Sequence, residues 1–240
     1  MKKDKYLTRL DKDNIHITTR PYLDKVLKHK KPYDVDVFGA KITVLPMVMS
    51  PEYDWAGLFM IHCLPRDLSG KDVLELGPGS GLVSVFAGLQ GARSVTAADI
   101  SPDAVKNTEL NLKKFKIKNS KAVLSDVFSK VPKKKYDIII WNLPYHDAEA
   151  KNNLEKGVMM DNYVMPTFFK EAKMYLKKGG KLYAGFSRSG NMARFMTELK
   201  KNHLNIEQMI EKNDWEHDSR FAAPELHYNC QLYVLSYKSQ

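Results

Sequence analysis

The amino-acid sequence predicts an α/β fold with a doubly wound, mostly parallel sheet. Short apolar runs of strand length alternate along the chain with segments whose apolar residues recur at helical spacing. Strands that alternate with helices indicate parallel strand–helix–strand units, with helices on both faces of the sheet. The most hydrophobic run, residues 136–141, is expected at the centre. The seven runs expected to form strands are 73–76, 94–99, 122–126, 136–141, 182–186, 206–210 and 230–237.

Length and composition limit the protein to ordinary globular classes. A chain of 240 residues, 43% apolar and 28% charged, can bury a full core in one large domain. Its longest apolar runs, such as residues 58–61, are far too short to cross a bilayer, and the charged start does not lead into a signal peptide. Cys63 and Cys230 have neither zinc-ligand nor redox spacing. We therefore expect a cytoplasmic protein that binds no metal and no membrane, with an undetermined oligomeric state.

The net charge of +10 comes almost entirely from lysine. Phosphate recognition usually favours arginine forks or organised lysine patches, so charge alone leaves a nucleic-acid partner open without favouring it. Nine lysines lie between Asn111 and Lys135, with Asp126 as the single acid among them. They join helix ends to the starts of strands, so we expect them at the amino edge of the sheet, opposite a ligand at the carboxyl edge.

The first part of the chain is interpreted as an N-terminal extension, residues 1–40, before a main domain, residues 41–240. A helix over 24–31 is expected to end at Pro32, since proline cannot continue a helix. Alternating apolar residues then indicate two short strands that turn at Gly39.

Capping residues mark the helices that follow. Ser50 is the expected N-cap of the next helix, because Pro51 suits the first helical position. Gly91 and Ser101 are expected to end one helix and to start another, and the Gly179-Gly180 pair is expected to close a later one. The helices expected after residue 81 are 82–90, 102–115, 162–177 and 192–202.

The chain is organised around the stretch 72–85, in which a buried strand leads through Gly77, Gly79 and Gly81 into a helix. Such a turn places unpaired backbone N–H groups against a ligand. The glycine spacing is G-x-G-x-G, whereas the dinucleotide fingerprint is G-x-G-x-x-G. With Glu75 just before it, the loop resembles the cofactor loop of the class I S-adenosylmethionine-dependent methyltransferases.

The resemblance implies a Rossmann-like sheet with a C-terminal antiparallel strand, and S-adenosylmethionine as the cofactor. Asp99 would accept hydrogen bonds from the two ribose hydroxyls, and Asp126 would accept from the adenine amino group. Glu75 would order the loop or the methionine amine, while Ile100 and Val127 are implied as further cofactor contacts. Asp99 alone would also suit a nicotinamide cofactor, but Asp99 together with Asp126 favours S-adenosylmethionine.

Asn142-Leu143-Pro144-Tyr145 follows the fourth strand and resembles the [DNS]-P-P-[YFW] signature of methyltransferases that modify amide or exocyclic amino nitrogens. Such a nitrogen is a poor nucleophile because its lone pair is delocalised. The Asn142 side-chain oxygen, which would also border the cofactor, and the Leu143 carbonyl can together pull the NH₂ group towards tetrahedral geometry. Pro144 would stiffen the turn, and Tyr145 would stack on a planar acceptor. Leu143 stands where the family has proline, which keeps the carbonyl but loses the rigidity.

The pattern is closest to the protein-glutamine and rRNA guanine amino-methyltransferases. We interpret the protein as an N-methyltransferase whose acceptor is an amide or amine of a small molecule or a protein side chain. An exocyclic amino group of rRNA and a non-catalytic cofactor-binding role remain alternatives, whereas the glycine spacing disfavours a nicotinamide oxidoreductase. The candidate substrate-binding residues are Ser50, Tyr53, Tyr145 and His146.

Overall fold

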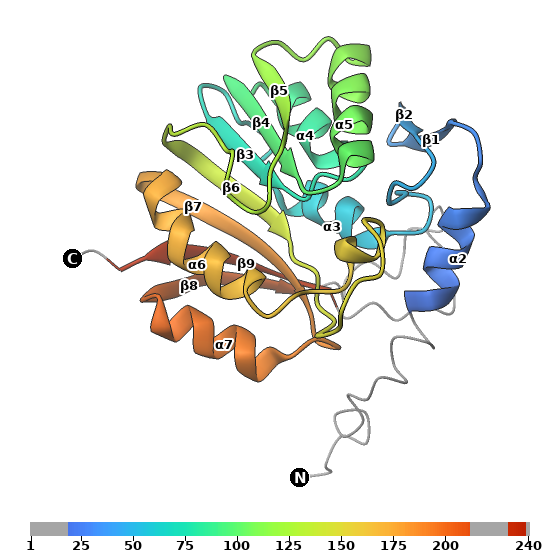
Figure 1. The fold of residues 1–240 in the computed structure, drawn as a ribbon. Helices are drawn as coiled ribbons and strands as arrows, with labels where there is room; N and C mark the ends of the chain where they lie inside the picture. Colours follow the sequence, from blue (N-terminus) through green and yellow to red (C-terminus); the bar gives the residue numbers. More distant parts are fainter. Residues whose placement is uncertain (1–18, 212–229, 239–240) are drawn as a thin grey trace.

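A seven-stranded sheet forms the centre of the protein (Figure 1). The computed structural model describes residues 19–211 and 230–238. The strand order is β5-β4-β3-β6-β7-β9-β8. Neighbours from β5 to β7 run parallel, whereas β9 runs antiparallel to both β7 and β8. The strands are β3 (Asp72–Leu76), β4 (Ser94–Asp99), β5 (Ser120–Leu124), β6 (Tyr136–Asn142), β7 (Leu176–Ser187), β8 (Leu204–Glu211) and β9 (Cys230–Tyr237). The predicted α/β fold is confirmed, and β6 lies at the centre of the sheet as expected.

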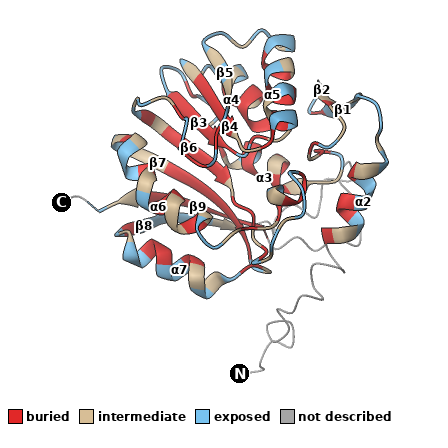
Figure 2. Cartoon of the chain, viewed as in Figure 1, coloured by how far each residue is buried: buried red, intermediate tan, exposed pale blue. Residues whose placement is uncertain are grey.

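Helices cover both faces of this sheet. Val73 and Ile138 are buried in the same cluster as residues of α3, α4 and α5, whereas Leu74 and Ile139 are buried with residues of α6 and α7. Adjacent residues of a strand point to opposite faces, so each central strand contributes to both layers. The central strands are largely buried (Figure 2). The helices are α2 (Arg20–Lys28), α3 (Trp55–Cys63), α4 (Leu82–Leu89), α5 (Pro102–Lys114), α6 (Val164–Tyr175) and α7 (Met192–Lys201), with the 3₁₀ helix η2 (Glu155–Gly157). No helix within the described residues is long and apolar enough to cross a membrane.

A separate hairpin of β1 (Tyr33–Val37) and β2 (Ala40–Val44) precedes α3. Its two turn residues, Phe38 and Gly39, both have positive φ, which is the geometry of tight two-residue hairpins. The predicted pair of strands around Gly39 is therefore confirmed. The hairpin straddles residue 40, where the sequence divides the chain into extension and main domain, and that division stays a prediction.

Two buried asparagines of α5 attach this hairpin to the glycine loop. The Asn111 amide donates to the Thr43 carbonyl (2.7 Å) and to the Ser80 carbonyl (2.8 Å), and its oxygen accepts from the Thr43 N–H (3.0 Å). The Asn107 amide donates to the same two carbonyls, and its oxygen accepts from the Leu45 N–H (2.7 Å). The edge of β2, the glycine loop and α5 are thus joined by shared hydrogen bonds.

The predicted start of α3 was wrong. The helix begins at Trp55 with Asp54 as its N-cap, because the Asp54 carboxylate accepts from the Ala56 N–H (3.0 Å). The Ser50 hydroxyl instead accepts from the Tyr33 hydroxyl (2.8 Å) and from the Glu52 N–H.

Three further boundaries differ from the sequence prediction. α2 starts at Arg20, with Pro21 in its first turn, and ends at Lys28 rather than extending to residue 31. α6 ends at Tyr175, because β7 begins directly at Leu176 and contains the glycine pair expected to close the helix. β5 ends at Leu124, so Asp126 follows the strand instead of ending it.

Candidate active site

The glycine loop between β3 and α4 is held in a conformation that only glycine adopts without strain. Gly77 and Gly81 have φ values of 61° and 79°. A Cβ on Gly77 would lie 2.8 Å from Nε1 of Trp141, and a Cβ on Gly81 would lie 2.9 Å from the backbone of Thr108. The loop therefore packs directly against β6 on one side and α5 on the other, which fixes its distance from the pocket.

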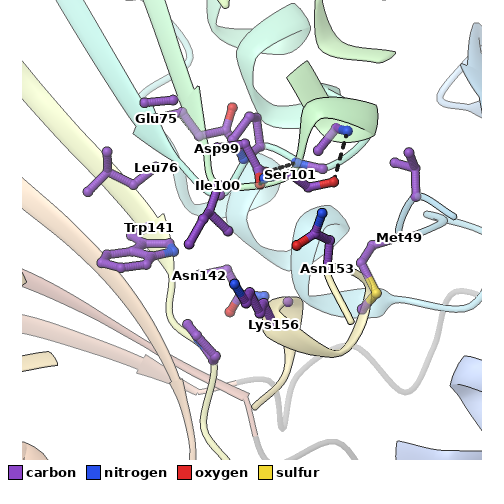
Figure 3. Close-up of a pocket in the computed structure, with 18 of the residues that line it drawn as sticks. Met49, Glu75, Leu76, Asp99, Ile100, Ser101, Trp141, Asn142, Asn153 and Lys156 are labelled. Atoms are coloured by element: carbon purple, nitrogen blue, oxygen red, sulfur yellow. Dashed lines mark hydrogen bonds between the residues drawn. The ribbon is translucent and has the colours of Figure 1, made fainter. Parts of the chain in front are cut away.

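Asp99, at the carboxyl end of β4, ties this loop to the start of α5. Its carboxylate accepts from the Gly79 N–H (3.2 Å) and from the Ser101 N–H (2.9 Å) (Figure 3). Burial raises the pKa of Asp99 to about 6, against the opposing effect of these two backbone hydrogen bonds. The side chain lies in the pocket lining at the position that the sequence predicted for a ribose acceptor.

Glu75 lies in β3 with its carboxylate buried beneath the loop. The Ser84 hydroxyl of α4 donates to it. Burial raises the pKa of Glu75 to about 7, and the nearby charge of Asp99 acts in the same direction. A carboxylate in this position favours cationic groups of a ligand.

One pocket at the carboxyl edge of the sheet brings most of the predicted residues together (Figure 3). Gly81 lies outside its lining, behind the loop against α5. Leu143 is also outside, with its side chain buried in the core on the α6 and α7 side of the sheet. The predicted residues that line the pocket are Glu75, Gly77, Gly79, Asp99, Ile100, Asp126, Val127, Asn142 and Pro144.

Sequence reasoning selected Ser50 and Tyr53 from the wall segment 47–54 before α3, and it missed the wall segment 153–164 around η2 altogether. The second follows the carboxyl end of β6, and segments that leave a parallel strand at that end lie over the ligand edge of the sheet. Their position in the chain was therefore a usable signal. Their missed lining residues include Met49, Asp54, Lys156 and Tyr163.

Asp126 is exposed at the rim, where the Tyr163 hydroxyl donates to its Oδ2 atom (2.8 Å). Burial, together with this bond and the charge of Asp126, raises the pKa of Tyr163 to about 12. Tyr163 therefore stays protonated and keeps the carboxylate oriented beside the pocket. The second oxygen of Asp126 remains for a ligand donor.

Asn142 ends β6 at the junction of this pocket and a second, smaller hollow. A Cβ on Gly185 would lie 2.8 Å from the Asn142 Oδ1 atom, so the glycine of β7 makes room for the amide. The Leu143 N–H donates to the Gly185 carbonyl (3.0 Å), which holds the turn despite the missing proline. Within the described residues, neither the Asn142 side chain nor the Leu143 carbonyl has a hydrogen-bond partner. The Asn142 amide is thus available where the two cavities meet, whereas Leu143 lines neither cavity.

The smaller hollow is lined by residues from distant parts of the chain. Tyr145 comes from the signature itself, Thr19 and Tyr22 from the region of α2, and Ser187 and Cys230 from β7 and β9. The hollow shares Asn142 with the larger pocket, so a group bound in it would reach the same amide.

The other candidate substrate-binding residues are engaged elsewhere. His146 is buried, with Nε2 2.5 Å from the Thr19 hydroxyl, and burial lowers the pKa of His146 to about 4. Tyr53 hydrogen-bonds to the His29 ring (2.7 Å), and Ser50 bonds within its own turn. Neither cavity is lined by these three side chains. Tyr145 lines the smaller hollow, and contact of all four residues with substrate stays a prediction.

Comparison with known proteins identifies the family. The family model for the methyltransferase small domain matches residues 40–215, which is most of the chain. The chain belongs to this methyltransferase family. It is a class I, S-adenosylmethionine-dependent methyltransferase, and the predicted cofactor is confirmed.

Three relatives show the range of acceptors in the family. The methyltransferase is 31% identical over 153 residues to a protein of Methanocaldococcus jannaschii named "Putative protein N5-glutamine methyltransferase", in a match that covers 61% of this chain and 75% of the relative. It is 33% identical over 158 residues to ribosomal RNA small subunit methyltransferase C of Pseudoalteromonas translucida, covering 64% of this chain but 43% of that protein. A solved 16S rRNA N2 methyltransferase from T. thermophilus, in complex with AdoMet and guanosine, has the same fold, with TM-score 0.62 and 19% identity over 87% of this chain and 50% of the other.

The pocket residues fit S-adenosylmethionine. Gly77 and Gly79 bring loop backbone without a side chain to the pocket lining, and Asp99 and Asp126 offer carboxylate oxygens to hydroxyl and amino donors. Glu75 and Asp54 add negative charge that suits the cationic sulfonium and ammonium groups of this cofactor. These residues would hold it at the carboxyl edge of β3, β4 and β6.

Proposed function

We propose that this methyltransferase transfers the methyl group to an amide or amino nitrogen of a protein side chain or a small molecule. The observation that carries the proposal is the Asn142 side chain at the junction of the two cavities, which has no hydrogen-bond partner within the described residues; the carbonyl of the next residue, Leu143, also has none. Two oxygen acceptors on consecutive residues suit the two hydrogens of one NH₂ group. Nitrogen specificity is therefore favoured over transfer to oxygen or carbon.

The chain would act mainly by orientation. The bound cofactor supplies an electrophilic methyl group on its sulfonium. Asn142 and Leu143 accept both N–H hydrogens, which turns the nitrogen lone pair towards that methyl group. Neither oxygen is basic enough to remove a proton at neutral pH, so they position the nitrogen before the proton is lost. Orientation of this kind is worth up to about 7–11 kcal/mol of the barrier.

The small hollow supports an acceptor that enters as a single side chain or a small molecule. Tyr145 offers an aromatic face there, and Tyr22 and Thr19 close the far side. The relative from Methanocaldococcus jannaschii, named "Putative protein N5-glutamine methyltransferase", supports a glutamine amide within this class.

An exocyclic amino group of rRNA is the second candidate, since the relative from Pseudoalteromonas translucida is named for ribosomal RNA. The lysine-rich segment 113–135 offers a surface for phosphates. However, Lys121 lies in β5, and Lys133 to Lys135 directly precede β6, so they lie towards the amino ends of the strands. That edge is opposite Asn142, which weakens the RNA alternative.

Labelled cofactor in a cell lysate tests the acceptor class. We expect the label in the protein fraction or in the small-molecule fraction. Label in protein should be released by protease, and label in either fraction should be unaffected by ribonuclease. Label lost on ribonuclease treatment would establish the RNA alternative. No transfer to any fraction, with cofactor binding intact, would favour a non-catalytic binding protein.

Asn142→Ala tests the mechanism. We expect a large drop in kcat with cofactor affinity almost unchanged, because the amide acts on the reacting nitrogen. Asn205→Ala, on the exposed face of β8, is the matched control and should not alter kcat. Turnover of Asn142→Ala within about twofold of wild type would contradict the nitrogen-orienting role.

A further inference from the structure

The pocket has an asymmetric charge distribution. Its lining within the described residues contains a single cationic side chain, Lys156 of η2. A ligand that carried only cationic groups would gain no favourable interaction from this ammonium. The acidic residues in the same lining are Asp54, Glu75, Asp99, Asp126 and Asp161.

The Lys156 ammonium also forms no ion pair within the part of the chain that the structure describes. No carboxylate oxygen of the described residues lies within 4.0 Å of it, whereas Lys114, Lys177 and Lys181 all form such ion pairs. A lysine that faces a strongly acidic pocket without forming a pair keeps its three donors available for an incoming anion. Figure 3 draws it among the residues that surround the pocket.

The short helix that carries Lys156 is firmly attached to the rest of the protein. The Glu155 carboxylate is buried and accepts from Arg20 of α2 (3.1 Å) and from the Lys151 N–H (2.7 Å). Leu154 is buried in a cluster with Tyr22 of α2 and its neighbours. The backbone of Lys156 is therefore fixed beside the pocket, and only its side chain adjusts.

We propose that Lys156 binds the α-carboxylate in the methionine part of S-adenosylmethionine. This cofactor carries two cationic groups, the sulfonium and the ammonium, and one anionic group, the carboxylate. Glu75 and Asp54 complement the first two, and Lys156 complements the third. The assignment rests on the cofactor and not on which acceptor is methylated.

Calorimetry with two cofactors that differ only at this group tests the assignment. Decarboxylated S-adenosylmethionine keeps the adenosine, the sulfonium and the amine. Lys156→Met should weaken binding of S-adenosylmethionine by about tenfold to a hundredfold, as expected for loss of a charge-assisted hydrogen bond, and should leave binding of the decarboxylated form within about twofold. Lys156→Arg should restore most of the affinity for S-adenosylmethionine. Lys151→Met, an exposed lysine outside the lining, is the matched control and should bind both like wild type.

The competing outcomes are distinct. Equal losses for both cofactors would overturn the carboxylate contact and indicate a general change in the pocket. Unchanged affinity for S-adenosylmethionine together with a raised KM for the acceptor would assign the ammonium to the acceptor instead. Binding of the decarboxylated form by Lys156→Met also reports that the variant is folded.

Discussion

Replacement of Asp99 by alanine should lower the affinity for the cofactor while the protein stays folded. The carboxylate has two functions in the structure: it accepts from the Gly79 N–H and so orders the glycine loop, and it lies in the pocket lining as the expected ribose acceptor. Loss of one charge-assisted hydrogen bond costs about 1.5–3 kcal/mol. Because the loop loses an anchor as well, we expect the upper part of this range, a fall in affinity of about thirtyfold to a hundredfold.

The assay is calorimetric titration with S-adenosylhomocysteine, the demethylated product, at several pH values. Asp99→Ala is compared with Asp103→Ala, which removes an exposed carboxylate from the first turn of α5 and should bind like wild type. Since the pKa of Asp99 is raised to about 6, its carboxylate is charged above this pH and protonated below it. Affinity in the wild type should therefore fall as the pH drops through about 6, and Asp99→Asn should remove the Asp99 part of the profile. The contributions of Asp54 and Glu75, whose pKa values burial raises to about 6 and about 7, would remain.

The result that would refute this reasoning is specific. An affinity of Asp99→Ala within about twofold of wild type, in a protein with an unchanged unfolding transition, would show that the carboxylate does not contact the ligand. An Asp99→Asn profile identical to wild type would show that Asp99 does not set the pH dependence.

Three further variants test the electrostatics. Glu75→Gln should raise the free energy of unfolding at about pH 8 by up to about 3 kcal/mol, because burial raises the pKa of the Glu75 carboxyl to about 7. Urea titrations should show that this gain shrinks as the pH falls towards about 5. Asp72→Asn should lower the free energy of unfolding at neutral pH by about 1–3 kcal/mol, because Arg93 and Lys177 hold the pKa of Asp72 below its usual range. The difference should begin to shrink only as the pH falls below about 4, and a difference that stays constant between about pH 4 and pH 2 would contradict it. Joint replacement of Lys133 to Lys135 by glutamine should leave KM almost unchanged across salt concentrations, whereas a large rise at low salt would favour an RNA acceptor.

The sequence predicted the sheet and the ligand edge because both depend on local patterns. The strand, glycine loop and helix at residues 72–85 form as expected, and Asp99 follows from its place at the end of a strand. The start of α3 was not predictable in this way, since Ser50 and Asp54 are both capping residue types and a tertiary bond from Tyr33 selects between them. Lys156 was missed for a similar reason.

Lys156 lies in a segment without regular period, and only the packing of Leu154 against α2 brings it to the pocket. The same applies to the smaller hollow, where Tyr145 meets Tyr22 across more than half of the chain. Patterns within one segment carry no information on such contacts. The positions of the loops that complete the site could therefore be found only from the structure, whereas the strands and helices that support the site could be predicted from the sequence.

The asparagine pair of α5 makes the N-terminal hairpin a reporter for the glycine loop. Because Asn107 and Asn111 each bind the Thr43 carbonyl and the Ser80 carbonyl, a ligand that restrains the loop also restrains β2. The Thr43 and Leu45 N–H groups donate to the same two side chains. Their hydrogen–deuterium exchange should slow when the cofactor binds, although neither residue lines the pocket. The hairpin and the loop would then open as one cooperative unit.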